Sequence, residues 1–377
     1  MKKKFFSVLL ASAMVFSLVA CGSSSDTTTE ATTEAATEAA TEEVADDTAA
    51  GVAKIGISMP TQDLQRWNQD GANMVAEFEA AGYETEILYA DNDDALQVTQ
   101  IETLIANGAE VLVVAAITST ALGTAMDQAL EAGIPVISYD RLIEDTDAVA
   151  YYVSFDNYVV GQVQGQYIID TLDLANTTET FTMEITAGDP ADTNAGYFFN
   201  GAMDLLQEYV DNGTIVITSG QTSFEEAATD GWSTETAQSR MDAILASYYS
   251  DGTQLDICLC SNDSTALGVV NSLTAAYTGE WPIVTGQDCD VANVLNILDG
   301  AQSMSVFKDT RTLASQTVTM VTQMLEGEAV DVNDTTTYNN GYKDIESYLC
   351  DPVFCDASNY EEILIESEYY STDDLGL

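Results

Sequence analysis

The chain has 377 residues, with 62 Asp plus Glu, 10 Lys plus Arg and no His, so its formal charge at pH 7 is −52. A hydrophobic content of 46% excludes a wholly disordered chain, and the length suffices for two domains with cores of their own. Such a negative surface disfavours nucleic acids and anionic lipids as partners, and the absence of His excludes sites that depend on an imidazole base.

The first twenty residues are typical of a secretory signal. Three lysines at 2–4 precede an apolar stretch at 5–20 that is too short for a membrane-spanning helix of about 20 residues. The stretch ends in Leu-Val-Ala-Cys-Gly, which resembles the lipobox of bacterial lipoproteins, in which the cysteine, here Cys21, is lipidated and becomes the N-terminus. We predict a lipoprotein signal peptide at 1–20, with membrane attachment through the lipid alone. The alternative is an ordinary signal peptide followed by a chance cysteine.

Residues 21–50 are predicted to form a tether behind the lipidated cysteine. From residue 22 the segment is almost entirely Ser, Thr, Ala, Glu and Asp, so it cannot form a core. Glutamates recur every fourth residue from Glu30 to Glu42, and like charges at that spacing destabilise a helix. We expect an extended, self-repelling linker. Eight acids lie in this segment and three lysines precede it, which leaves 54 acids and seven cations in 51–377.

From residue 51 onward, apolar strands alternate with amphipathic helices. The expected strands, in chain order, are 54–58, 85–89, 111–114, 135–139, 151–154, 181–187, 214–218, 256–260, 282–286 and 303–307. The expected helices are one ending at Gly82 and others near 94–107, 119–132, 158–173, 194–211, 233–248, 264–277, 290–299 and 310–326. This rhythm predicts parallel sheets with right-handed crossovers. Acidic junctions at 155–157 and 287–288 divide the pattern, so we expect two lobes.

Polar and aromatic side chains follow several of these strands. Ligands of open parallel sheets bind beyond the carboxyl ends of the strands. The residues expected there are Arg66, Trp67, Asp140, Arg141, Asn194, Trp232, Asn262, Asp263, Asp288 and Lys308. Carboxylates accept hydrogen bonds from hydroxyls, Arg and Lys donate to them, and indoles stack on C–H faces. The set therefore predicts a site for a neutral polyhydroxylated ring, a monosaccharide. The alternative is a set of helix caps and salt bridges between lobes.

Eight short segments carry a family resemblance. They are Arg66-Trp67, Tyr139-Asp140-Arg141-Leu142-Ile143, Ser154-Phe155-Asp156-Asn157, Asp230-Gly231-Trp232, Ser261-Asn262-Asp263, Gly286-Gln287-Asp288-Cys289-Asp290, Phe307-Lys308-Asp309-Thr310-Arg311 and Asn339-Asn340-Gly341. In order and spacing, from about 54 to 370, the chain resembles a type I periplasmic sugar-binding protein of an ABC importer, in the xylose-binding and multiple-monosaccharide-binding branch. The segment 187–194 departs from that family's usual paired glycines and adjacent asparagines.

The resemblance implies an α/β fold of two lobes, each a parallel sheet flanked by helices, joined by a three-segment hinge. The lobes would comprise 51–157 plus about 290–331, and 158–289 plus about 332–377. The lobes would close over one aldose, such as xylose, glucose, galactose or arabinose, and present a closed surface to the importer's membrane permease. The ten residues named above would bind the sugar. The resemblance further implies a monomer without a cofactor or catalytic activity, held at the outer face of the cell membrane or in the periplasm.

Two other functions remain open from the sequence. The same module could serve as a sugar sensor that presents its closed form to a chemoreceptor or kinase. A glycosidase is the other alternative, because its paired carboxylates need no histidine. Three cations at the expected sheet edge argue against the glycosidase.

The cysteines and the acidic loops suggest few further sites. A disulfide from Cys258 or Cys260 to Cys289 is possible, as is one between Cys350 and Cys355, and unpaired thiols are the alternative. Acids at 91, 93 and 102 have the spacing of a calcium loop, but leucine replaces its required glycine, so we predict no metal site.

Overall fold

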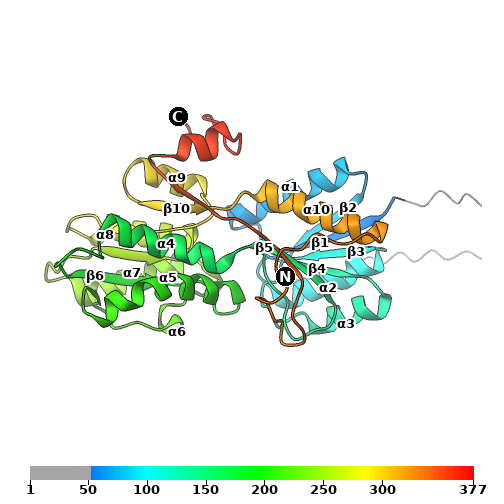
Figure 1. The fold of residues 1–377 in the computed structure, drawn as a ribbon, viewed down its shortest axis with the longest axis horizontal. Helices are drawn as coiled ribbons and strands as arrows, with labels where there is room; N and C mark the ends of the chain where they lie inside the picture. The colour runs from blue at the N-terminus through cyan, green and yellow to red at the C-terminus, as the bar shows by residue number, and fades with distance from the viewer. Residues whose placement is uncertain (1–51) are drawn as a thin grey trace, which may run out of the picture. The chain divides into compact units, whose positions relative to one another are not determined.

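The computed structural model describes residues 52–377. The signal peptide, Cys21 and the tether predicted for 1–50 lie outside the described residues. No helix within the described range is long and apolar enough to span a bilayer. The described chain builds two parallel β-sheets covered by helices, so the predicted α/β class is confirmed (Figure 1).

The first sheet has six strands in the order β11-β5-β4-β3-β1-β2, and every pairing in it is parallel. Its strands are β1 (Lys54–Met59), β2 (Glu84–Tyr89), β3 (Val111–Val114), β4 (Val136–Tyr139), β5 (Val149–Phe155) and β11 (Ser347–Cys350). Helices α1 (Gln65–Ala80) and α10 (Thr310–Glu326) cover one face, and α2 (Asp94–Ala106) and α3 (Gly123–Ala132) cover the other (Figure 1). Strand β3 is buried along its whole length, as expected for a strand with helices on both faces.

The second sheet has the order β7-β6-β8-β9 and is also parallel. Its strands are β6 (Phe181–Thr186), β7 (Ile215–Ile217), β8 (Ile257–Cys260) and β9 (Ile283–Val284). One core cluster lies beneath α4 (Asn157–Thr171) and α5 (Thr193–Asp211), and another beneath α7 (Thr234–Ile244) and α8 (Asp263–Ala276). Shorter helices are α6 (Phe224–Ala227), the 3₁₀-helix η1 (Asp230–Trp232) and the π-helices η2 (Leu245–Tyr249) and η3 (Glu361–Glu366).

A two-stranded antiparallel ribbon extends the second sheet. Helix α9 (Val291–Leu298) leads into β10 (Met304–Phe307), which pairs with β12 (Val353–Asp356). A bridge between Gln287 and Val306 joins this ribbon to the chain that follows β9. The ribbon therefore belongs with the second sheet, although it lies far along the chain from β6 and β7.

The chain passes between the two groups of strands three times. The passages lie between β5 and α4, between β10 and α10, and between β11 and β12. Two segments differ from the predicted lobe boundaries. Residues 291–307 were predicted in the first lobe but join the second sheet, and residues 347–350 were predicted in the second lobe but join the first sheet. The acidic junction at 287–288, which the sequence predicts to divide the lobes, is instead a loop of the second sheet, since hydrophobic periodicity does not show which sheet a strand joins.

Candidate functional site

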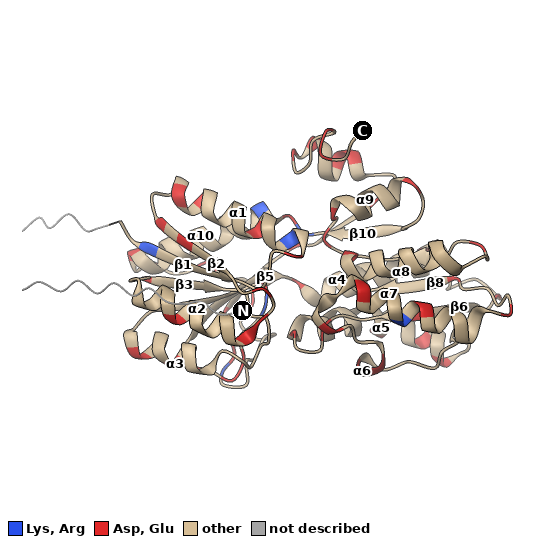
Figure 2. Ribbon diagram, turned by 180° about the vertical axis from the view of Figure 1, so that it is seen from behind, with Lys and Arg blue, Asp and Glu red and all other residues tan. Residues whose placement is uncertain are grey.

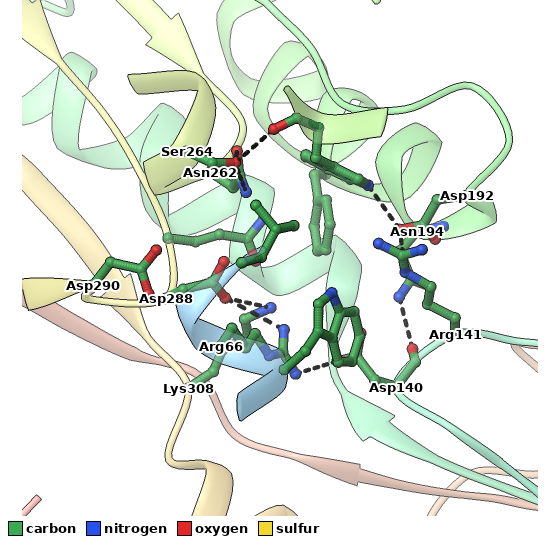
Figure 3. Close-up of a pocket in the computed structure, with 15 residues that line it drawn as sticks. Arg66, Asp140, Arg141, Asp192, Asn194, Asn262, Ser264, Asp288, Asp290 and Lys308 are labelled. Atoms are coloured by element: carbon green, nitrogen blue, oxygen red, sulfur yellow. Dashed lines mark hydrogen bonds and ion pairs between the residues drawn. The ribbon is translucent and has the colours of Figure 1, made fainter. Parts of the chain in front are cut away.

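A pocket lies where the carboxyl ends of strands from both sheets meet (Figure 3). Its lining comprises Leu64, Arg66, Trp67, Asp140, Arg141, Asp192, Asn194, Phe198, Trp232, Asn262, Ser264, Gln287, Asp288, Asp290 and Lys308. The first five follow β1 and β4, and the others follow strands of the second sheet and its ribbon. Nine of the ten predicted site residues are therefore brought together, and Asp263 alone is not among the lining residues.

Arg66 lies in the first turn of α1 and contacts three carboxylates. Its Nε donates to Oδ2 of Asp70 at 3.0 Å, one Nη donates to Oδ1 of Asp288 at 3.3 Å, and the other donates to Asp140. Burial alone would lower the pKa of Arg66, but the attraction of these carboxylates outweighs burial and raises that pKa. The guanidinium is therefore a permanent positive charge that ties the end of β1 to Asp288 of the second sheet.

Lys308 provides a second cation beside the same carboxylate. Its ammonium lies 2.9 Å from Oδ1 of Asp288 and 5.6 Å from the centre of the Phe198 ring. Burial would raise the pKa of Asp140, yet Arg66, Lys308 and Arg141 together lower it below its usual value. Asp140 is thus an ionised hydrogen-bond acceptor inside the pocket.

Arg141 forms the corresponding link on the other side of the pocket. Its Nε lies 3.0 Å from Oδ2 of Asp192, and one Nη donates to the carbonyls of Ala116 and Ile117. Trp232 also donates to Oδ2 of Asp192, from Nε1 at 3.2 Å. These contacts join the edge of the first sheet to the loop between β6 and α5.

Aromatic rings complete the walls. The guanidinium carbons of Arg66 and Arg141 lie 5.3 Å and 5.0 Å from the centre of the Trp67 ring, within cation–π range. Phe198 meets Trp232 edge to face at 6.2 Å. A β-carbon at Gly188 would lie 1.9 Å from the Trp232 ring, so a glycine there leaves the space that the indole occupies. The pocket thus combines flat apolar surfaces with charged donors and acceptors.

The comparisons with known proteins identify the family. The family model described as the periplasmic binding protein domain matches residues 55–329. The chain belongs to the periplasmic binding protein family. It is 43% identical over 331 residues to the multiple sugar-binding periplasmic receptor ChvE of Rhizobium radiobacter, covering 87% of this chain and 93% of the receptor. It is 31% identical over 322 residues to the D-xylose-binding periplasmic protein of Escherichia coli, covering 85% of this chain and 92% of that one.

Solved structures of binding proteins agree with this assignment. A solute-binding protein of an ABC transporter from Clostridium phytofermentans, solved with bound β-D-glucose, is 60% identical with a TM-score of 0.85, covering 85% of this chain and 99% of that one. A carbohydrate transporter's solute-binding protein from Chloroflexus aurantiacus, solved with D-glucose, is 36% identical with a TM-score of 0.77, covering 85% and 97%. The predicted family and the two-lobed type I fold are therefore confirmed.

Asp263 has a supporting position in this periplasmic binding protein. Its carboxylate is fully buried and accepts hydrogen bonds from Nε2 of Gln302, from Oγ of Ser305 and from the backbone N–H of Asp290. Burial, together with the nearby Asp290 and Asp288 carboxylates, raises the pKa of Asp263. Asp263 thus holds the loop that carries Asp288 and Asp290, and it is not exposed to the pocket.

Some site residues also cap helices, as the alternative interpretation expected. Asn262 caps α8 by accepting from the backbone N–H of Thr265 at 3.0 Å, and Asp192 caps α5 by accepting from that of Asn194. The Asn194 amide donates to the carbonyl of Asp140 at 2.7 Å. Capping and pocket lining are therefore combined in the same side chains, because both functions need a polar group at the end of a strand.

Sequence reasoning missed six lining residues, Leu64, Asp192, Phe198, Ser264, Gln287 and Asp290. Phe198 lies one helical turn after Asn194, a spacing that could have indicated the same helix face. Asp290 lies two residues after Asp288, and its Oδ1 is buried without a hydrogen-bond partner in the described part of the chain. Burial and the Asp288 carboxylate raise the pKa of Asp290 to about 7. Leu64 gave no signal, because nothing distinguishes an apolar wall from a core residue.

The acidic loops and the cysteines form no further site in the described residues. Within 52–377, no group of three or more acidic or cysteine side chains could hold a metal ion. Cys258, Cys260, Cys289, Cys350 and Cys355 are all buried thiols in the structure, so neither of the two possible disulfides is formed there, in line with the alternative of unpaired thiols. Cys258 and Cys260 lie in a different core cluster from Cys289, and a passage between the sheets separates Cys350 from Cys355.

Proposed function

We propose that this protein is an extracytoplasmic solute-binding protein that captures one monosaccharide and delivers it to an ABC importer. The observation that carries the proposal is the composition of one pocket, in which two arginines, a lysine, carboxylates and two indoles converge from both sheets. Ring hydroxyls are both donors and acceptors, so they can replace the ion pairs that these side chains make with one another, while the indoles contact the C–H face.

The ligand class follows from the charges. A phosphorylated or carboxylated sugar would place a further anion near Asp140, Asp192, Asp288 and Asp290, whereas a neutral aldose adds no charge. Hydrogen bonds to charged groups contribute about 1.5 to 3 kcal/mol each, and several of them suffice for a dissociation constant near micromolar. We propose xylose, glucose, galactose or arabinose as candidates, because two related structures contain bound glucose and a third relative is a D-xylose-binding protein.

Closure of the two lobes about the three passages is the proposed mechanism. Arg66 with Asp288 and Arg141 with Asp192 are pairs whose partners follow strands of different sheets. A sugar bound among them would bridge the same elements and favour the closed form by its larger contact there. Such capture breaks no covalent bond, so we propose no catalytic residue. The lipid anchor at Cys21, the permease partner and the monomeric state belong to the same proposal.

A thermal-shift screen tests the ligand. Purified protein is heated with each of the four aldoses at millimolar concentration, and with a nucleotide, an amino acid and glucuronic acid as controls. At least one aldose should raise Tm, because a ligand that binds only the folded state stabilises it. If no neutral aldose raises Tm, the proposed ligand class is wrong. A separate assay incubates the purified protein with chromogenic aryl glycosides. If it hydrolyses them, the protein is instead a glycosidase.

The importer and sensor alternatives are separated in cells. Deletion of the gene should abolish uptake of the sugar found in the screen if the protein serves an importer. Unchanged uptake together with lost chemotaxis or transcriptional response would instead support the sensor.

A further inference from the structure

Two cysteines from distant parts of the chain share one small core. Cys289 follows β9 and Cys355 lies in β12, and both are fully buried. Their cluster is completed by Val294, Phe307, Leu364, Tyr370 and Leu375. The tyrosine hydroxyl donates to the carbonyl of Cys289 at 3.0 Å, so the C-terminal segment closes over this pair.

Ser305 fixes the position of both cysteines. It is the direct partner of Cys355 in the antiparallel pair of β10 and β12, where side chains of opposite residues lie on the same face. The hydroxyl of Ser305 accepts from the backbone N–H of Cys289 at 3.1 Å. The backbone of Cys289 therefore lies over the face of the ribbon from which the Cys355 side chain projects. Burial, together with contact from the Cys355 thiol, raises the pKa of Cys289.

No other pair among the described cysteines is placed as well. Cys258 and Cys260 are two residues apart on β8, where the extended chain separates Cα atoms by about 6.6 Å, near the upper limit for a disulfide. Cys350 packs in the core of the first sheet, apart from the other four.

We propose that Cys289 and Cys355 form a disulfide when the chain folds in an oxidising environment. One thiolate attacks the sulfur of an oxidant disulfide, such as an exported disulfide-exchange protein or oxidised glutathione, and displaces one thiolate from it. The second cysteine thiolate then attacks the mixed disulfide and releases the other thiolate. The two cysteines lose two protons and two electrons, and the oxidant is reduced to two thiols.

Because both cysteines are buried in the folded protein, the disulfide between them must form at an earlier stage of folding. Only a thiolate attacks, and the folded core excludes the oxidant from both cysteines and, by raising the pKa of Cys289, keeps that thiol protonated. The cross-link therefore forms while the C-terminal segment is still open, and the closed core afterwards protects it from reductants. It would close a long loop and anchor the residue next to Asp288, where both Asp288 and Cys289 adopt positive φ angles of 99° and 52°.

Oxidative refolding of the full chain tests the proposal. The denatured, reduced protein is refolded with a mixture of reduced and oxidised glutathione, free thiols are blocked with N-ethylmaleimide, and peptides are mapped without reduction. We expect a linked peptide pair containing Cys289 and Cys355, an intact mass about 2 Da lower, and a Tm roughly 5 °C above that of the reduced protein. Alkylation of both cysteines, or their linkage to other cysteines, would overturn the proposal.

Variants provide the matched controls. Cys258→Ser and Cys350→Ser change buried cysteines outside the pair and should retain the linked peptide. Cys289→Ser and Cys355→Ser should each lose it, together with the difference in Tm between oxidised and reduced protein. If either of these two variants does not fold, the peptide map of the unsubstituted chain still decides the question. Sugar binding is measured separately, so its failure would leave this result standing.

Discussion

At the scale of single residues, the site depends on how a few cations neutralise a group of buried acids. Arg66 faces three carboxylates, and Asp288 faces both Arg66 and Lys308. Removing one partner of a buried pair leaves the other charge uncompensated, which costs about 3 to 5 kcal/mol. Substitutions of Arg66 or of its carboxylate partners therefore change both the stability of the protein and its affinity for a ligand. A test of binding alone is clearer at a charged residue that has fewer ion-pair partners.

Arg141→Ala is the sharper test of binding. Since Arg141 lines the pocket and pairs with Asp192, its loss should weaken sugar affinity at least about 100-fold and abolish the ligand-induced rise in Tm. Asp288→Ala should also abolish the rise in Tm, and its apo protein should stay folded but melt at a lower temperature, because Arg66 and Lys308 both lose this partner. Arg311→Ala is the matched control, because Arg311 pairs with Asp309 and is not among the lining residues. Full affinity in both pocket variants would show that the sugar binds elsewhere.

Asp290 predicts a pH dependence of stability. Its pKa is about 7 in the folded protein against 3.8 for a free aspartate, so the folded state holds the proton more tightly. The contribution of this group to stability therefore falls as pH rises from about 4 to 7 and is constant above that range. Asp290→Asn removes the effect and should be more stabilising at pH 8 than at pH 5, by roughly 2 to 3 kcal/mol.

Urea unfolding at the two pH values measures this difference. Asp299→Asn is the matched control, because it removes a carboxylate that lies exposed at the end of α9 instead of inside the pocket. If Asp290→Asn behaves like that control, the pKa of Asp290 is not raised in the folded protein.

The sequence could predict most of the charged groups of the pocket and its two indoles, but not the apolar side chains of Leu64 and Phe198. Arg66, Arg141 and Lys308 stood out because cations are rare and each follows a predicted strand. Asp263 followed a strand too, but it is the first residue of α8, and its side chain turns toward Gln302 and Ser305 instead of the pocket. That orientation depends on packing between elements, which residue spacing along one chain does not contain.

At the scale of elements, glycines set how closely α4 and α5 approach. A β-carbon at Gly201 would lie 2.1 Å from the carbonyl oxygen of Tyr158 in α4, and backbone atoms cannot move aside as a flexible side chain can. Gly201→Ala should therefore push the helices apart and lower the free energy of unfolding by about 1 to 3 kcal/mol.

The same helix offers a control for this substitution. A β-carbon at Gly196 of α5 would meet no atom within 4 Å. Gly196→Ala should therefore stabilise the protein by about 0.5 to 1 kcal/mol, through helix propensity alone. Chemical denaturation of the two variants should shift in opposite directions. A similar destabilisation in both would show that the helix itself, rather than its contact with α4, is sensitive at these positions.

The elements themselves were more predictable than their partners. The alternation of strands and helices follows from local hydrophobic patterns, and β1, β3 and β4 lie close to their expected positions. Strands β11 and β12 were not expected, because each has four residues and its burial comes from pairing with β5 or β10 far away in the chain. The lobe boundaries were wrong for the same reason.

At the scale of the whole molecule, charge is the dominant feature. Figure 2 shows acidic residues on the helices that cover both sheets. With 54 acids against seven cations in 51–377, the folded chain repels itself more strongly than the expanded chain does. Salt should therefore stabilise it: raising NaCl from about 10 mM to about 200 mM should raise Tm by several degrees. KCl should give the same rise, since screening does not depend on the cation, and a fall in Tm would contradict the repulsion.

The two late strands also determine when the molecule can finish folding. One edge of β5 stays open until β11 has been synthesised, nearly two hundred residues later, and β10 must wait for β12. The first sheet and the β10–β12 ribbon therefore cannot be completed before the last part of the chain is present, whereas the strands of the second sheet are complete at β9. Until about residue 356 has emerged, both edges offer unpaired backbone groups to any other strand nearby. During most of its synthesis, the growing chain therefore carries strand edges to which a strand of another chain could add.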